Sequence, residues 1–422
     1  MDERRAQAIF SRFVQIPSVT GSPGEETACR LLEKVLDEYK ISHERISEDP
    51  GRPNLLACLP STCPRSKPTL VLISHIDVVD GDQAKWHFPV FSGESVDGRI
   101  RGRGTLDTKQ LTMMELAAFT SLVQSKRCRD VYFLATVDEE CGSRFGMETV
   151  CRKRPKLFEN AFVINEGGGF PVYVDGRPYM TVTVGEKSLF RVRLSAKGTG
   201  GHASVPTDNQ AVVHLAAALE KLFSGPCQLE SGSRRAAEAI ERIIKGKQLE
   251  GAAAMLYDYT RGSSLSMRNW QIGQRVNVLP TSVECIIEIR SRPRTDPAEV
   301  AAFVRKKLEG TRCFYEMLPA EEGFECGLDD PMLQLLSDST KKAGHPMPIF
   351  PMLALGRTDG RYFGKSGSRV YGCSPCTQDD PFDQVLRMVH GSDESIAEAS
   401  FRFGCQTLGH AISEFCTEEC TP

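Results

Sequence analysis

Three short apolar runs, each followed at once by histidine or acidic residues, constrain the fold of this chain of 422 residues more than any other feature. The runs and the polar residues that follow them are Leu70–Ile73 with His75 and Asp77, Val131–Val137 with Asp138–Glu140, and Ala161–Ile164 with Glu166. Short runs that are apolar throughout are typical of strands buried on both faces of a parallel sheet. Such sheets bind ligands at their carboxyl edge, where all three polar groups would lie.

Strand and helix patterns alternate along the chain. We expect strands at Pro68–Ser74, Arg129–Thr136 and Asn160–Ile164. Between the first two, Gln110–Leu122 is rich in Leu, Met and Ala and predicts a helix, as does Asp393–Phe415 near the C-terminus. This alternation favours an α/β architecture with a mostly parallel sheet flanked by helices.

The length of the chain exceeds that of one ordinary core, so two domains are expected. From about Gly185 the apolar residues alternate with polar ones, as in a strand with one solvated face. The pattern of the residues that follow predicts a small α+β domain inserted into the first domain. We therefore predict a discontinuous domain of residues 1–184 and 310–422, with residues 185–309 as the insertion.

The composition excludes several classes of protein. The formal net charge is -3 without long runs of one sign, so no nucleic-acid partner is expected. The N-terminal stretch lacks the apolar core of a signal peptide, and no apolar run approaches the ~20 residues of a membrane span, so we expect a cytoplasmic protein without membrane contact.

The cysteine pattern also indicates a protein of a reducing compartment. The 15 cysteines are odd in number and scattered, unlike those of a secreted disulfide scaffold. Only Cys373 and Cys376 form a C-x-x-C pair, and no second pair matches it. We interpret the two as thiols in a turn rather than as a zinc or redox site.

Two more candidate ligands lie just before predicted helices: Asp107, in a glycine-bounded turn, and His390. Each candidate alone has a simpler interpretation, since Asp107 could cap its helix and a histidine beside a strand or helix often packs or caps. Together, however, so many acidic groups at one edge would repel one another without a cation. Two histidines with three carboxylates suit zinc. A shared aspartate can bridge two metals about 3.5–4 Å apart, as in two-metal hydrolases.

With these residues assembled, the chain resembles the di-zinc metallopeptidase and aminoacylase family, which includes glutamate carboxypeptidase, carboxypeptidase S, aminoacylase, acetylornithine deacetylase and succinyl-diaminopimelate desuccinylase. The resemblance covers nearly the whole chain, and details such as Trp86–Pro89 look closest to carboxypeptidase S. The matching segments are Ser74–Val79, Gly102–Lys109, Asp138–Glu140, Asn165–Gly168, Gly201–Pro206, Asn277–Pro280, Thr358–Arg361 and His390–Glu394.

The resemblance implies a site for two Zn²⁺ ions, in which Co²⁺ or Mn²⁺ could also fit. It implies that His75 and Glu140 bind opposite metals and that Asp107 bridges them. Glu166 would complete the coordination of one metal and His390 that of the other. Which metal takes which carboxylate is left open.

The resemblance also implies roles around the metals. Asp77 would orient His75, as second carboxylates often do for ligating histidines. Glu139 would be the general base that takes a proton from the metal-held water. His202, in the inserted domain, would stabilise the oxyanion of the tetrahedral intermediate, with a loop histidine as the alternative interpretation.

The substrate follows from the same resemblance. Asn277 and Arg361 would hold a free carboxylate of the substrate, although Arg361 could instead be a surface charge. The leading function is hydrolysis of the amide bond in an N-acyl amino acid or short peptide. The alternatives are a biosynthetic deacylase or desuccinylase of a smaller diacid and, in a different class, a non-catalytic carboxylate-binding protein. The inserted domain would be a lid through which a homodimer could form.

The chain departs from the family pattern at positions that are not predicted ligands. Asp393 stands where relatives usually carry asparagine, and Arg357 stands where they often have a second glycine. Neither departure removes a predicted metal ligand, whereas Arg357 and the Cys373–Cys376 region bear on the shape and charge of the specificity pocket.

Overall fold

The structure is a computed structural model that describes residues 1–63, 67–205, 207–273 and 276–417. Pro206, the last residue of the motif around His202, lies outside the described residues. Every residue predicted for the site is among the described ones.

The chain forms two compact units. The first consists of Met1–Gly185, Ala239–Leu256 and Cys326–Pro422, and the second of Glu186–Glu238 and Tyr257–Glu325. The second unit therefore continues beyond residue 309, where the predicted insertion ends, and is interrupted once. The assignment of catalytic and lid roles to these parts stays a prediction.

Local pairing explains both differences in the boundaries. The strand β15 (Cys313–Met317) pairs with β10 (Ser188–Lys197), which extends the sheet of the second unit past residue 309. The segment that interrupts the second unit, Ala239–Leu256, is hydrogen-bonded to the first unit: the backbone N–H of Asp175 donates to the carbonyl of Gln248 at 2.9 Å.

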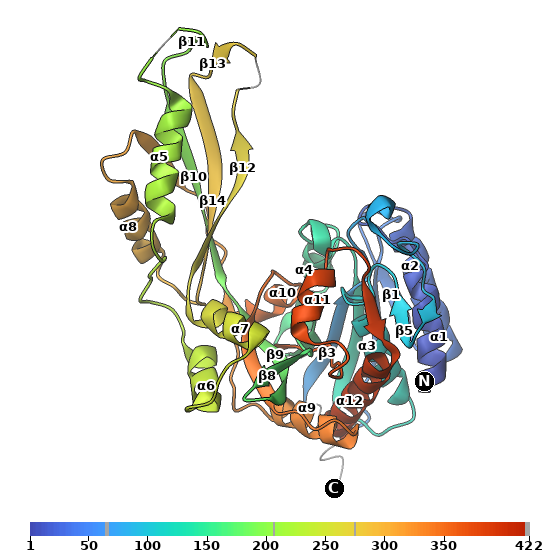
Figure 1. Cartoon of the computed structure of the whole chain (residues 1–422). Helices are drawn as coiled ribbons and strands as arrows, with labels where there is room; N and C mark the ends of the chain where they lie inside the picture. The colour runs from blue at the N-terminus through green and yellow to red at the C-terminus, as the bar shows by residue number, and fades with distance from the viewer. Residues whose placement is uncertain (64–66, 206, 274–275, 418–422) are drawn as a thin grey trace. The chain divides into compact units, whose positions relative to one another are not determined.

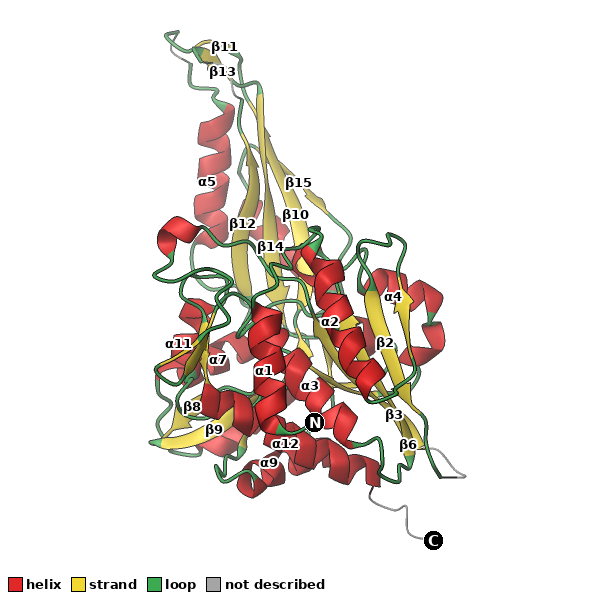
Figure 2. Ribbon diagram, turned by 90° about the vertical axis from the view of Figure 1, so that its right-hand side faces the viewer, coloured by secondary structure: helices red, strands yellow, loops and turns green. Residues whose placement is uncertain are grey.

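The first unit is built on a central sheet in which the strands follow the order β1-β2-β6-β3-β7-β18-β9, with β8 and β17 paired to β9 (Figures 1 and 2). The four middle strands, β6, β3, β7 and β18, are parallel. The predicted α/β fold with a mostly parallel sheet is therefore confirmed. The strands are β1 (His43–Ile46), β2 (Asn54–Leu59), β3 (Lys67–His75), β6 (Arg129–Thr136), β7 (Phe162–Asn165), β8 (Pro171–Val174), β9 (Arg177–Glu186), β17 (Ile349–Ala354) and β18 (Arg369–Gly372).

Helices cover this sheet. The helix α3 packs against β3, β6, α1 and α12, and α12 also packs against α9. Since α3 is buried on all sides, its Leu-, Met- and Ala-rich sequence is explained by burial rather than by one apolar stripe. The helices of this unit are α1 (Glu3–Val14), α2 (Gly24–Glu38), α3 (Lys109–Ser121), α4 (Met147–Lys153), α9 (Pro331–Lys342), α10 (Gly360–Gly364), α11 (Phe382–Met388) and α12 (Glu398–Thr417).

The last helix begins later than the sequence predicts. It starts at Glu398 rather than Asp393, because Ser395–Ala397 forms the strand β19 and pairs with β5 (Arg99–Arg101). The backbone of Asp393 has a φ of 58°, which a right-handed helix cannot contain. The small sheet made by β19, β5 and β4 (Ser95–Val96) thus takes residues that the periodicity assigns to a helix.

The second unit contains an antiparallel sheet of four strands in the order β12-β14-β10-β15. Along β10 the buried and half-buried residues alternate, as the sequence predicts for a strand with one solvated face. The helix α5 packs on this sheet and on α8, which closes the core of the unit. The elements are α5 (Ala211–Phe223), α8 (Pro297–Leu308), β11 (Gly201–His202), β12 (Ser264–Gln271), β13 (Val278–Leu279) and β14 (Ser282–Ser291).

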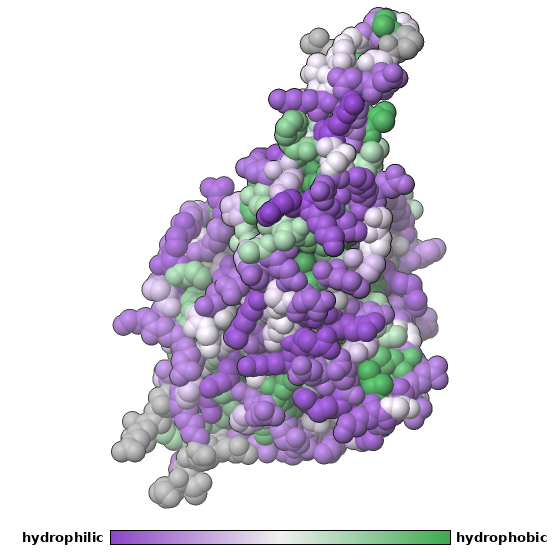
Figure 3. All heavy atoms as spheres, turned by 90° about the vertical axis from the view of Figure 1, so that its left-hand side faces the viewer, coloured by the Kyte–Doolittle hydropathy of each residue, from purple (hydrophilic) through white to green (hydrophobic). Residues whose placement is uncertain are grey.

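The remaining elements complete the described chain. They are α6 (Arg235–Ile244), α7 (Gly251–Arg261), β16 (Phe324–Glu325) and the 3₁₀ turns η1 (Gln83–Lys85), η2 (Glu139–Cys141) and η3 (Pro155–Phe158). Hydrophilic side chains predominate on the face shown in Figure 3, where hydrophobic ones form separate patches. Among the described residues, no helix has both the length and the apolar character that crossing a membrane requires.

Candidate metal centre

The predicted ligands gather at the carboxyl edge of three neighbouring parallel strands. The strand β3 ends at His75, while Glu139 and Glu140 follow β6 and Glu166 follows β7. Because β6, β3 and β7 are adjacent and parallel, their ends lie side by side. The sheet therefore delivers one imidazole and three carboxylates to the same place.

Asp107 lies between two imidazoles. Its Oδ1 is 3.1 Å from Nε2 of His75, and its Oδ2 is 3.1 Å from Nε2 of His390. Oε2 of Glu166 is 3.4 Å from the same nitrogen of His75, and Oε2 of Glu140 is 3.1 Å from that of His390. Two groups result, each with one imidazole, one carboxylate of its own and one oxygen of Asp107.

Asp77 fixes the turn that carries the acidic pair. Its backbone carbonyl lies 2.9 Å from Nδ1 of His75, and since a carbonyl only accepts, this nitrogen carries the proton and leaves Nε2 for a metal. The Asp77 carboxylate, 3.6 Å from His75 Nδ1, accepts instead from the backbone N–H of Glu139 at 3.2 Å and of Glu140 at 3.3 Å. The hydroxyl of Thr20 donates to it at 2.8 Å. The Asp77 carboxylate therefore links Thr20 to the turn that carries Glu139 and Glu140.

Glu139 lies at the centre without direct hydrogen bonds. One of its carboxylate oxygens is within 4.8 Å of ligand atoms of His75 and Glu166. Among the described residues no hydrogen bond to this carboxylate is found, and the nearest cationic atom, Nη1 of Arg361, is 3.9 Å away. Burial, and next the charge of Glu166, raise the pKa of Glu139 well above its usual range.

Arg361 is buried rather than on the surface, which argues against the alternative of a surface charge. Its Nη1 donates to the carbonyl of Thr358 at 2.7 Å, and its Nη2 donates to the hydroxyl of Ser143 at 3.1 Å. The guanidinium also stacks over the ring of Tyr362, 4.6 Å from its centroid. These contacts hold the guanidinium on the Glu139 side of the centre.

The donors present fit a pair of divalent ions. Burial raises the pKa of Glu166 to about 7, while hydrogen bonds to Asp107 and Glu140 raise that of His390 to about 10. Burial would raise the pKa of Asp107, but bonds from His390 and His75 lower it well below its usual range. Protons on the imidazoles thus balance the carboxylates here, and a cation between them would do the same. Imidazole nitrogens mixed with carboxylate oxygens suit zinc.

Comparison with known proteins agrees with this geometry. The sequence profile of Peptidase family M20/M25/M40 matches residues 71–414. The chain belongs to this family. It is therefore a hydrolase that acts on amide bonds in peptides or acyl amino acids, and the family membership expected from the motifs is confirmed.

Individual relatives resemble this family member along most of its length. It is similar to the N-fatty-acyl-amino acid synthase/hydrolase PM20D1 of Bos taurus, with 27% identity, 96% of this chain and 87% of that protein covered. It is also similar to Aminoacylase-1 of Dictyostelium discoideum, with 25% identity and coverage of 89% and 90%. The fold matches the M20 family metallo-carboxypeptidase Sso-CP2 from Sulfolobus solfataricus with a TM-score of 0.73, at 19% identity and with 98% and 99% of the two chains covered.

Two predicted site residues of this M20/M25/M40 family member belong to the second unit. His202 is in β11 and pairs with Val278 of β13, so Asn277 precedes its pairing partner. The carbonyl of Asn277 accepts from the N–H of Ala203 at 3.0 Å, and Nδ1 of His202 lies 2.7 Å from the Ser204 hydroxyl. The structure brings these two residues together at one exposed tip. Their roles toward a substrate stay predictions.

A buried ion pair that the sequence analysis missed connects two ligand loops. Oε1 of Glu394 accepts from the N–H of Leu106 at 2.6 Å and of Asp107 at 3.3 Å. Nη1 of Arg103 donates to Glu394 at 2.7 Å, and its Nη2 donates to the carbonyl of Gly391 at 2.7 Å. The pair therefore ties the loop of Asp107 to the loop that follows His390. Both residues lie inside matching motif segments, which was the available signal.

The unusual Asp393 has a structural explanation. Its carboxylate accepts from the backbone N–H of His87 at 2.8 Å and lies 2.6 Å from Nδ1 of the same ring. A carboxylate can accept both bonds, whereas an asparagine would accept one and would have to donate to the ring nitrogen. Asp393 thus anchors the loop Trp86–Pro89 to the segment after His390.

The C-x-x-C pair lies on a segment bonded to the loop of Glu166, since the backbone N–H of Cys373 donates to the carbonyl of Asn165 at 2.7 Å and that of Cys376 to the carbonyl of Gly169 at 3.0 Å. Cys373 and Cys376 are fully buried, and burial raises the pKa of the Cys376 thiol. Among the described residues, no cluster that could hold a metal contains a cysteine. Residues 373–376 are irregular rather than a turn, and the interpretation of the pair as thiols without a zinc or redox role stays a prediction.

Proposed function

We propose that the chain is a two-zinc hydrolase that cleaves the amide bond of N-acyl amino acids or short peptides bearing a free C-terminal carboxylate. The observation that carries the proposal is Asp107, whose two oxygens each face a different imidazole at 3.1 Å. A single ion would need only one of these two pairs of carboxylate oxygen and imidazole nitrogen. Co²⁺ or Mn²⁺ would fit the same donors.

The grouping of side chains supports one assignment of the ligands. His75, Asp107 and Glu166 would hold one ion, and His390, Asp107 and Glu140 the other. Ions bound there would polarise the scissile carbonyl and supply a water whose pKa is lowered toward ~7.

Glu139 would act as the general base. Its carboxylate lies among the ligands, yet no hydrogen bond engages its oxygens in the described part of the chain. It would receive the proton of the attacking water and return it to the leaving amine, as acid after base. The hydrogen bonds from the backbone N–H groups of Glu139 and Glu140 to Asp77 fix the backbone of this turn, so the two neighbouring side chains start from a defined position.

The substrate would be recognised by groups of both units. Arg361 offers a planar guanidinium for a carboxylate on the Glu139 side of the centre. Asn277 would contact the same carboxylate, and His202 would stabilise the oxyanion when the second unit serves as a lid. A non-catalytic protein could also bind a carboxylate through Arg361 and Asn277, but it would not need a general base such as Glu139.

A homodimer through the second unit is part of the proposal. Several large apolar side chains of this unit are exposed, and exposed apolar surface is one mark of a protein–protein interface. They are Val205, Val213, Met267, Trp270, Val276, Val278 and Phe314. Light scattering coupled to gel filtration tests the dimer, and a monomer across micromolar concentrations would remove it from the account.

The test of the proposed function is Glu139→Ala in the zinc-loaded protein. We expect zinc content to stay at two per chain while hydrolysis of N-acyl amino acids falls by roughly 10³-fold or more, since a general base and the water it orients are lost together. Glu148→Ala is the matched control, because Glu148 is an exposed carboxylate in the first turn of α4. Near-unchanged turnover in Glu139→Ala would exclude Glu139 as the base.

A further inference from the structure

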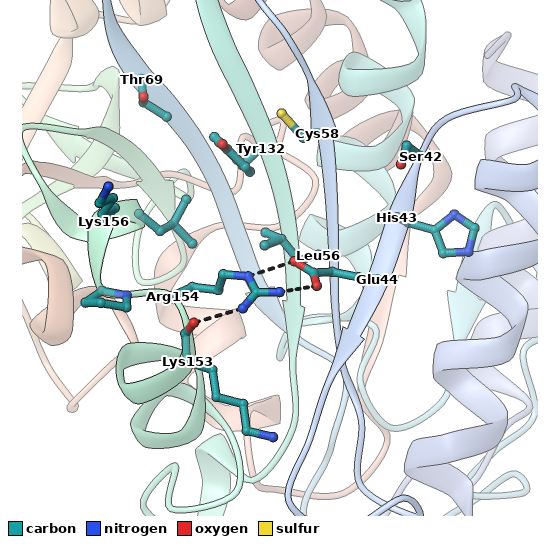
Figure 4. Close-up of a pocket in the computed structure, with 12 residues that line it drawn as sticks. Ser42, His43, Glu44, Leu56, Cys58, Thr69, Tyr132, Lys153, Arg154 and Lys156 are labelled. Carbon is teal, nitrogen blue, oxygen red and sulfur yellow. Dashed lines mark hydrogen bonds and ion pairs between the residues drawn. The ribbon is translucent and has the colours of Figure 1, made fainter.

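A cavity of about 670 Å³ lies in the first unit, away from the metal centre (Figure 4). Thr69, near the start of β3, lines this cavity, whereas His75 ends the same strand. The two residues are six steps apart along the extended strand, which corresponds to about 20 Å. None of the residues that line the cavity belongs to the metal centre.

The floor of the cavity is one face of the central sheet. Leu56 and Cys58 are two residues apart on β2, and Cys58 lies opposite Tyr132 of β6. Residues two apart on a strand share a face, so these side chains and Thr69 lie together. Leu157 of η3 adds a second buried leucine. The floor is therefore mostly apolar, with hydroxyl groups from a tyrosine and a threonine.

The hydroxyl of Tyr132 stays protonated throughout the neutral range. Burial, and next the neighbouring Cys58 thiol, raise the pKa of Tyr132 to about 12. Such a hydroxyl can donate a hydrogen bond to an oxygen of a bound molecule.

The rim of the cavity is cationic. Arg154 is neutralised by Glu44, since Nε donates to Oε1 at 2.9 Å and Nη2 to the other oxygen. Lys153 donates to the carbonyl of Ser47. The side chain of Lys156 forms no hydrogen bond or ion pair with any described residue, and Figure 4 shows it apart from the Arg154–Glu44 pair. With three cations and one carboxylate, the rim carries an excess of positive charge.

We propose that this cavity binds a small organic carboxylate with an aliphatic or aromatic body, whose charged group lies at Lys156 and whose body covers Leu56 and Leu157. The volume falls in the range of about 300–1,000 Å³ that small-molecule sites occupy. An inorganic anion would leave the apolar floor in water, and a neutral apolar molecule would not use the ammonium. The proposal is independent of the reaction at the metal centre.

Calorimetric titration of the zinc-loaded protein with 4-phenylbutyrate tests the proposal. We expect Lys156→Glu to weaken binding about tenfold, because attraction becomes repulsion at the rim. The neutral 4-phenylbutanamide should also bind more weakly than the acid. Lys126→Glu is the matched control, since Lys126 is an exposed lysine that does not line the cavity, and it should bind as the wild type does.

A second variant tests the volume rather than the charge. Thr69→Phe fills the cavity from its side and should abolish binding without changing the unfolding midpoint. Equal affinity of wild type, Lys156→Glu and Thr69→Phe would overturn the proposal. Loss of all binding when zinc is removed would also overturn it, because the carboxylate would then be binding only at the metal centre.

Discussion

The metal centre and the tip around His202 are both predicted parts of the site, but they are held in different ways. At the centre, the side chains of His75 and Asp77 are almost fully buried, and each ligand is within 3.4 Å of another. At the tip, His202 and Asn277 are exposed and are oriented by local contacts of two-residue strands. The metal centre is therefore organised before any substrate arrives, whereas the orientation of the exposed side chains at the tip depends on contacts with a substrate or a partner.

The largest effect is expected from the residue shared by both imidazoles. Asp107→Ala removes two donor oxygens at once, so zinc content should fall from two per chain to one or none, and hydrolysis should fall by roughly 10⁴-fold or more. Elemental analysis and a hydrolysis assay measure both. Glu159→Ala, an exposed carboxylate, is the control. Two retained zinc ions with turnover within tenfold of wild type would contradict the bridging role.

At the tip we expect a purely kinetic effect. His202→Ala should lower kcat by about 10²–10³-fold, the loss typical of one oxyanion donor, while zinc content and thermal stability stay at wild-type values. Stability should not change because the imidazole of His202 is exposed and the hydrogen bonds found for it among the described residues are to Ser204 in the same turn. Unchanged kcat would leave His202 as the loop histidine of the alternative interpretation.

The ion pair between the ligand loops should affect the centre indirectly. Arg103→Met leaves Glu394 buried without its cation, which should cost about 3–5 kcal/mol of unfolding free energy and weaken zinc binding about 10–100-fold. Urea denaturation and competition with a chelator measure the two quantities. Arg402→Met is the matched control, since Arg402 pairs with Glu398 near the surface and should cost less than about 1 kcal/mol. Equal effects of the two variants would show that the Arg103 pair does not organise the site.

The last effect concerns pH and the second unit, and it builds up gradually with pH. Burial, and next Arg290 and Arg292, lower the pKa of Lys187 to about 7. Between pH 7 and about 10.5 the unfolded chain binds a proton that the folded chain does not, so this residue makes stability rise with pH in that window, by at most about 1.4 kcal/mol per unit. Below pH 7 its contribution is constant.

Replacement of Lys187 isolates this contribution. Lys187→Met should remove the rise, so the difference in unfolding free energy between variant and wild type should shrink as pH increases from 7 to 10. Lys197→Met, at an exposed position of β10, should keep the wild-type slope. A difference that stays constant with pH would show that Lys187 is charged in the folded protein.

The central sheet could be predicted from the sequence because its strands are buried on both faces. β6 (Arg129–Thr136) has the predicted bounds, and β3 contains the predicted Pro68–Ser74. β15 could not be predicted, since only its pairing with β10, more than 100 residues earlier in the chain, makes it a strand. Cys313–Met317 contains Phe314 and Tyr315, which favour strands, but it is short and lacks the alternation of apolar and polar residues that would predict one.

The candidate site shows the same limit. Local motifs were enough to name the residues that meet at the sheet edge. They could not show that each oxygen of Asp107 faces its own imidazole, or that the Asp77 carboxylate accepts from Glu139 and Glu140 rather than mainly from His75. Glu394 was missed because its function lies in a contact to Asp107 from 287 residues away. Contacts over such separations are absent from any local pattern.

The central claim is that Asp107 joins two ions. Anomalous X-ray scattering above the zinc edge, on crystals of the zinc-loaded protein, tests it directly. The account predicts two peaks about 3.5–4 Å apart, one beside His75 and Glu166 and the other beside His390 and Glu140, with Asp107 between them. A single peak, or peaks away from Asp107, would contradict it.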